Sequence, residues 1–111
     1  LNCSLNQIEN LNCLPNSLEI LDFEYNNIQM FNFPLNLKIL NCSNNNILFL
    51  NKFPESLEKL VCYDNNMNIL NNITTSLKRL VCGIEITRGY RKKTFKHIKK
   101  NFPNLKIEIK I

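Results

Sequence analysis

Five cysteines are the side chains of this 111-residue chain best suited to chemistry. Cys3, Cys42, Cys62 and Cys82 each follow a leucine by two residues, as in "LNC" and "LVC". Free cysteine is often buried as a small hydrophobe, and the paired C-x-x-C spacing of a zinc site is missing. An odd number of widely spaced cysteines favours a reducing, intracellular compartment. We therefore expect core thiols, no metal and no cofactor, with Cys13 exposed and open to oxidation.

The remaining reactive side chains indicate no catalytic site. His97, the single histidine, has no acidic or nucleophilic partner nearby in the sequence. Two glycines are too few for a phosphate-cradling loop. The carboxylates of Asp22, Glu24 and Asp64 fall at positions expected to face solvent from short strands. The chain is therefore not expected to be an enzyme.

The cysteines recur because the chain repeats itself. Four units align, "SLEILDFEYNNIQMFNFP", "NLKILNCSNNNILFLNKFP", "SLEKLVCYDNNMNILNNIT" and "SLKRLVCGIEITRGY", after a partial "LNCSLNQIENLNCLP". Their leading leucines, Leu18, Leu37, Leu57 and Leu77, lie 19, 20 and 20 residues apart, a period typical of solenoids. We therefore predict a repeat domain over residues 1–87, with a partial first repeat and four further units.

Each unit predicts a short strand followed by a turn. The alternation around the second leucine, as in Lys59, Leu60 and Val61, places neighbouring side chains on opposite faces. Every coil should then add one strand to a parallel sheet. About ten residues remain to bring the chain back, too few for a strand and a full helix, so extended or single-turn backbone is expected there. The strands end at asparagines whose carboxamides should bond neighbouring coils, namely Asn6, Asn26, Asn45 and Asn65.

The C-terminal residues differ from the repeats in charge. Residues 1–87 carry 5 Lys/Arg and 8 Asp/Glu, a net charge of −3, whereas residues 88–111 carry 9 and 1, a net charge of +8. Phe95, Ile98 and Phe102 share one face of a helix predicted at about 90–101, and "LKIEIKI" predicts a strand at about 105–110. We expect both to cap the open end of the core. The other helix face carries candidate anion-binding residues, although a solvated surface is the simpler interpretation: Lys92, Lys93, Lys96, Lys99 and Lys100.

The repeat pattern L-x-x-L-x-[C/F]-x-x-N-x-[I/M], followed by F-P or L-P, resembles the leucine-rich repeat in its short form of about 20 residues. The starts "LPNSLEIL" and "FPESLEKL" look like the P-x-S-L repeats of social amoebae and the repeats of bacterial effectors. The asparagine-rich composition is similar to that of leucine-rich repeat proteins from amoeba-infecting giant viruses. The resemblance implies an α/β solenoid, a horseshoe segment with a parallel sheet on its concave face and an irregular convex side. A viral source would imply the host cytoplasm or the virion.

A non-catalytic protein-protein interaction module is the function that this architecture favours, with the concave face binding a partner protein. Tyr25 and Tyr63 are the expected anchors, because tyrosine is enriched among residues that dominate interface energies. Two alternatives stay open: nucleic-acid or virion-associated binding through the basic helix, and self-assembly through the strand edge at residues 1–5. No apolar stretch reaches the roughly 18 residues of a membrane span. The expected contact residues are Ile20, Asp22, Glu24, Tyr25, Asn41, Ser43, Asn44, Lys59, Val61, Tyr63, Asp64, Arg79 and Val81.

Overall fold

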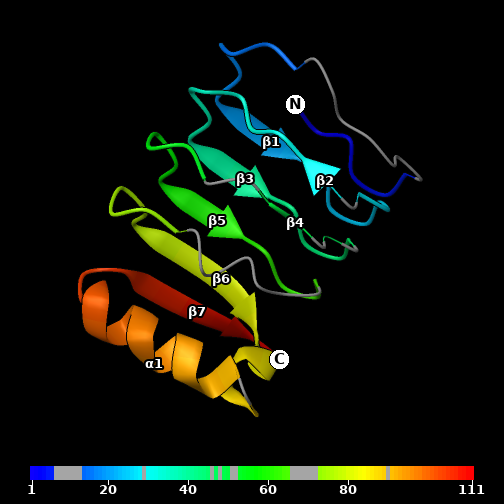
Figure 1. Ribbon diagram of the computed structural model, residues 1–111. Helices are drawn as coiled ribbons and strands as arrows, with labels where there is room; N and C mark the ends of the chain where they lie inside the picture. The colour runs from blue at the N-terminus through cyan, green and yellow to red at the C-terminus, as the bar shows by residue number, and fades with distance from the viewer. Residues whose placement is uncertain are drawn as a thin grey trace.

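The computed structural model describes residues 1–6, 14–28, 30–45, 47, 49–50, 53–65, 73–89 and 91–111. Its main element is a five-stranded, all-parallel sheet in the order β1-β3-β5-β6-β7 (Figure 1). The strands are β1 (Ile20–Asp22), β3 (Ile39–Asn41), β5 (Lys59–Val61), β6 (Arg79–Gly83) and β7 (Lys106–Lys110). Strand order follows chain order, so each coil adds one strand beside the last. This arrangement is compatible with a small α/β solenoid.

The central leucine of each repeat strand explains the buried side of the sheet. Leu21, Leu40, Leu60 and Leu80 are register partners on neighbouring strands, and all four are fully buried. Because neighbouring strands lie about 4.8 Å apart, these side chains stack into one continuous row. A second buried row lies two residues further along and consists of Phe23, Cys42, Cys62 and Cys82.

Residues 1–5 continue the sheet beyond β1. Asn2 forms a parallel bridge with Asp22. The Cys3 N–H donates to the Asp22 carbonyl and the Leu5 N–H donates to the Glu24 carbonyl, each at 2.8 Å. The partial first repeat therefore pairs in parallel with the next coil, as the complete units pair with one another.

The side of the coils opposite the sheet is expected to be irregular, and in part it is extended. A second, two-stranded parallel sheet joins β2 (Met30–Phe31) to β4 (Phe49–Leu50). In the last unit, residues 73–76 ("ITTS") stand where the earlier units have a proline before the strand. The turn is nevertheless the same there: the Leu77 N–H donates to the Thr74 carbonyl at 3.2 Å, as the Leu57 N–H donates to the Pro54 carbonyl at 3.1 Å. The proline is therefore not required for the turn.

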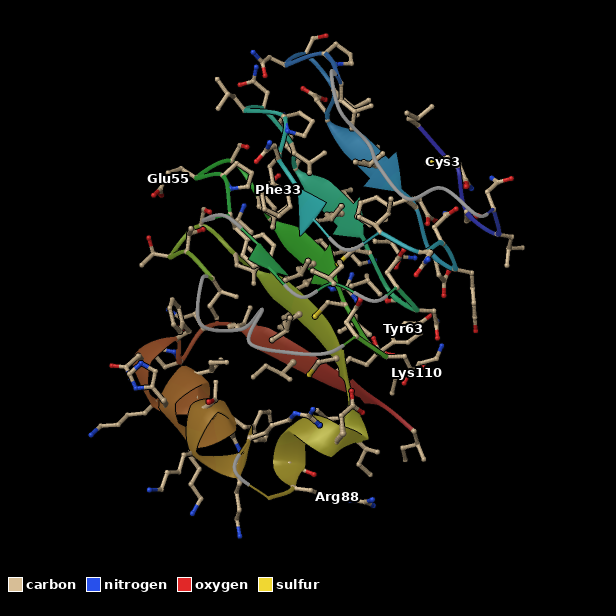
Figure 2. All side chains as sticks on the ribbon, turned by 45° about the vertical axis from the view of Figure 1, so that its right-hand side comes forward. Cys3, Phe33, Glu55, Tyr63, Arg88 and Lys110 are labelled. Atoms are coloured by element: carbon tan, nitrogen blue, oxygen red, sulfur yellow. The ribbon has the colours of Figure 1, made fainter. Side chains whose placement is uncertain are left out.

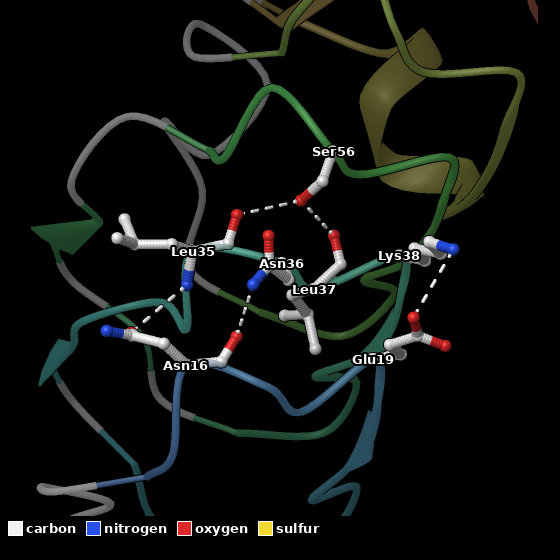
Figure 3. A network of polar contacts seen from close by, with 7 residues as sticks. All are labelled: Asn16, Glu19, Leu35, Asn36, Leu37, Lys38 and Ser56. Atoms are coloured by element: carbon white, nitrogen blue, oxygen red, sulfur yellow. Dashed lines mark hydrogen bonds and ion pairs between the residues drawn. The ribbon is translucent and has the colours of Figure 1, made fainter.

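Side-chain hydrogen bonds tie the starts of consecutive coils together (Figure 3). The Asn36 carboxamide donates to the Asn16 carbonyl at 2.9 Å. The Ser56 hydroxyl lies against two carbonyls of the preceding coil, those of Leu35 at 3.1 Å and Leu37 at 2.6 Å. These contacts help to hold the coils in register just before the strands begin.

Helix α1 (Arg91–Asn101) and β7 close the C-terminal end of the core (Figure 1). Strand β6 runs into a 3-10 helix (Ile84–Thr87), and α1 then returns the chain so that β7 pairs in parallel with β6. Ile98 is fully buried, and Phe95 and Phe102 pack against the same core. These three side chains cover the core from the helix face that the sequence predicts.

An asparagine ladder joins the coils where the strands end. The Asn26 Nδ2 donates to the carbonyls of Cys3 and Phe23, both at 2.9 Å, and the Asn65 Nδ2 donates to the Cys42 carbonyl at 2.7 Å. Each carboxamide thus bonds its own coil and the preceding one. The residues just before these asparagines have φ between 52° and 58°, in the left-handed region: Leu5, Tyr25, Asn44 and Asp64. The ladder holds a turn that most side chains rarely adopt.

Candidate binding face

The outward side of the five-stranded sheet is the main candidate site. Strand side chains alternate between faces, so the residues beside each buried leucine point away from the core. Helix α1 packs on the buried side through Ile98. We call the outward side the open sheet face. Its strand residues are Ile20 and Asp22, Ile39 and Asn41, Lys59 and Val61, Arg79 and Val81, and Lys106 and Glu108.

One row of this face changes from apolar to cationic across the five strands. Ile20, Ile39, Lys59, Arg79 and Lys106 are consecutive register partners. Ile20 and Ile39 keep 54% and 37% of their surface exposed, while Lys59 is half-buried and the last two are exposed. At a strand spacing of about 4.8 Å the row extends about 19 Å. We call Lys59, Arg79 and Lys106 the cation row; none of them forms an ion pair with another described residue.

One residue earlier in each unit, the charges alternate in sign. The Lys38 Nζ lies 3.3 Å from a Glu19 carboxylate oxygen (Figure 3), and the Lys78 Nζ lies 2.8 Å from a Glu58 carboxylate oxygen. The hydrogen bond and charge of Lys78 lower the pKa of the Glu58 carboxyl, and the charge of Lys38 adds to the effect. This column therefore neutralises itself, whereas the cation row does not.

A polar cluster occupies the carboxyl edge of the sheet, centred on Glu24. Its carboxylate accepts a hydrogen bond from the Tyr63 hydroxyl and others from Asn41 at 3.3 Å and Asn44 at 3.5 Å. The Lys110 Nζ lies 5.2 Å from the centroid of the Tyr63 ring, so the two side chains adjoin (Figure 2). The bond to Glu24 is the main cause that raises the pKa of Tyr63 to about 12, and burial and the Glu24 charge add to it. Tyr63 thus links the repeats to the cap.

The expected contact residues differ widely in how much of their surface is exposed. Ser43 is fully buried. By the register of the strands it lies between Glu24 and Tyr63, whose side chains are hydrogen-bonded to each other across it. The expected exposure of Ser43 is therefore wrong, and contact of the remaining residues with a partner stays a prediction. Val81 keeps only 9% of its surface exposed, whereas Tyr25 keeps 51%, and Asp64 is exposed at the carboxyl edge.

Strand β7 supplies side chains to this face that the sequence analysis assigns only to a cap. Lys106 pairs in register with Arg79, and Glu108 pairs with Val81. The alternation in "LKIEIKI" predicts that these charges share one face of a strand. It does not predict which strand β7 joins, and that pairing decides the composition of the open sheet face.

The described cysteines are free thiols: Cys42, Cys62 and Cys82 are buried in the core, and Cys3 is half-buried against it. Burial raises the pKa of the Cys42 thiol to about 12 and, with a nearby carboxylate, raises the pKa of Cys82 to about 11. Burial also raises the pKa of Cys62 well above its usual value. Thiols that stay protonated at neutral pH are poor nucleophiles. Among the described residues no three His, Cys, Asp or Glu side chains gather as a metal site; Cys13 lies outside this part of the chain.

The helix lysines form a separate basic surface. The five candidate anion-binding residues, Lys92, Lys93, Lys96, Lys99 and Lys100, are all exposed. The Lys99 Nζ lies 5.5 Å from the centroid of the Phe95 ring. Because Ile98 turns the opposite side of α1 into the core, these lysines do not belong to the open sheet face.

No protein-family model matches the chain, and no curated protein matches it at a significant level. In the described segments, no helix combines the length and the apolar character that a membrane crossing requires.

Proposed function

We propose that this chain is a non-catalytic interaction module that binds a partner protein through the open sheet face. We further propose that its units are short leucine-rich repeats, so that this face is the concave side of a horseshoe. The row from Ile20 to Lys106 supports the proposal, because it places exposed apolar and cationic side chains side by side on one sheet. Protein interfaces combine such apolar anchors with surrounding polar groups.

Selection of displayed protein fragments against the chain tests this function. Ile20→Asp together with Ile39→Asp should abolish binding of the selected fragments, because two carboxylates would replace the apolar part of the row. Leu35→Asp together with Ile111→Asp is the matched control, since both leucine and isoleucine there are highly exposed, at 69% and 102%, outside the row. Equal binding by the two double variants contradicts the proposal.

Nucleic-acid binding through α1 is the second candidate, favoured by the five exposed helix lysines. None of these lysines forms an ion pair with another described residue. Binding to a DNA duplex should then weaken steeply with salt, with a logarithmic slope of about −0.9 for each phosphate neutralised. Lys92→Glu with Lys96→Glu should reduce both the affinity and the slope. A slope that these substitutions leave unchanged rules the helix out as the contact.

A further inference from the structure

We propose that the cation row recognises a carboxylate-rich, extended segment of the partner protein. This segment crosses β5, β6 and β7 with its acidic side chains and reaches β3 and β1 with apolar ones. The inference rests on the proposed binding function of the open sheet face and names the chemistry of the partner.

The placement of like charges in register is the first argument. Lys59 pairs with Arg79, and Arg79 pairs with Lys106, on adjacent strands. Like charges in directly paired positions destabilise a sheet. One residue before Lys59 and Arg79, the coils of β5 and β6 carry opposite charges, and the Lys78 Nζ lies 2.8 Å from a Glu58 carboxylate oxygen. Neighbouring coils can therefore place opposite charges side by side, but the cation row does not. An anionic ligand relieves the repulsion in the cation row.

The dimensions of the row are the second argument. Lys59 and Lys106 lie two strand intervals apart, about 10 Å, which is the span of about three residues of extended chain. The whole row, about 19 Å, matches about six residues. Arg79 stands in the middle, and its planar guanidinium can bind a carboxylate through two parallel hydrogen bonds. A short acidic run therefore fits across β5, β6 and β7.

The surroundings of the cation row favour a peptide over a nucleic acid. Ile20 and Ile39 extend the row with exposed apolar surface, which the apolar side chains of a peptide can cover and a phosphate backbone cannot. Asp22 lies on β1, two residues from Ile20 and on the same face. Its carboxylate repels the closely spaced phosphates of a nucleic acid, whereas the apolar side chains that a peptide places there carry no charge.

Display of random peptides of about 12 residues, about twice the length of the row, against the whole chain tests the inference. The selected peptides should carry apolar residues toward one end and Asp or Glu toward the other. Lys59→Gln, Arg79→Gln and Lys106→Gln in one variant should weaken their binding about tenfold or more in fluorescence anisotropy at low salt. The same variant should unfold at a temperature no lower than the wild type, because it removes the like-charge repulsion.

A helix variant controls for net charge. Lys92→Gln, Lys96→Gln and Lys100→Gln remove the same charge from α1 and should leave peptide binding within about twofold of the wild type. Equal weakening by both triple variants would show non-specific attraction and overturn the inference.

The remaining outcomes separate this inference from the proposed function. Peptides that require Ile20 and Ile39 but show no acidic bias overturn the inference and leave the function standing. A DNA oligonucleotide that binds through the cation row as tightly as the selected peptides overturns the choice of a peptide ligand. Recovery of no peptide overturns the inference alone, because displayed protein fragments test the function separately. Peptides that ignore every substitution on the open sheet face contradict both.

Discussion

Replacement of Asn45 by alanine tests whether the asparagine ladder holds the coils together. Its Nδ2 donates to the carbonyls of Phe23 at 3.0 Å, Cys42 at 3.1 Å and Ser43 at 3.0 Å. Its Oδ1 accepts the N–H of Ile28 at 3.0 Å. One side chain therefore serves four backbone groups on two consecutive coils, and alanine can serve none of them.

The cost of Asn45→Ala follows from what each backbone group keeps. The Phe23 carbonyl retains a hydrogen bond from Asn26, and the Cys42 carbonyl retains one from Asn65. Loss of the Asn45 hydrogen bond to each of these carbonyls should therefore lower the free energy of unfolding by about 0.5–1.5 kcal/mol. Ile28 is fully buried, and its N–H loses the partner that Asn45 supplies, which costs about 1–3 kcal/mol. Summed over these three groups, the expected loss is about 2–6 kcal/mol, a large share of the roughly 5–15 kcal/mol that stabilises a domain.

Urea denaturation followed by circular dichroism measures this loss, with Asn6→Ala as the matched control. Asn6 occupies the same column, but it is exposed, and its Nδ2 bonds the carbonyls of Cys3 and Ser4, each at 3.0 Å. Water can replace those bonds, so the control should lose less than about 1 kcal/mol. If Asn45→Ala loses no more than Asn6→Ala, the ladder does not stabilise the coils and the reasoning fails.

Three further predictions concern the core, the carboxyl edge and pH. Ile98→Ala should leave a cavity under α1 and cost about 2–5 kcal/mol; a thermal midpoint equal to that of the wild type would contradict the packing of the cap. Tyr63→Phe removes the donor to Glu24 and should cost about 1 kcal/mol in urea, whereas Tyr25→Phe, at an exposed ring, should be neutral. Burial raises the pKa of Cys42 from 9.0 to about 12, so the unfolded thiol ionises first as pH rises. Above pH 9 the wild type should lose about 1.4 kcal/mol per pH unit more than Cys42→Ala, and parallel curves between about pH 8.5 and 10.5 would refute this.

The sheet and its cap are predictable because they depend on local periodicity. Alternation around Leu40 and Leu60 dictates which side chains a strand buries, and a 20-residue period places the next strand beside it. Likewise, Phe95, Ile98 and Phe102 fall on one helix face whatever the rest of the chain does. In each case, burial of apolar surface and local pattern favour the same arrangement.

The carboxyl edge is less predictable because it depends on contacts between coils. The bond from Tyr63 to Glu24 joins side chains 39 residues apart, and no pattern within one unit indicates it. Ser43 is buried although simple alternation predicts exposure, because the hydrogen bond between Tyr63 and Glu24 spans its position in the column. The pairing of Lys106 with Arg79 depends on how α1 packs on the core, which no local sequence pattern specifies.

The order of the strands has a consequence for how the chain folds. Each strand pairs with the strand of the adjacent coil, so folding proceeds through a series of loop closures of about 20 residues and requires no distant ends to meet. Each coil contacts only its neighbours, so order that begins in one pair of coils can spread to the next through one interface at a time.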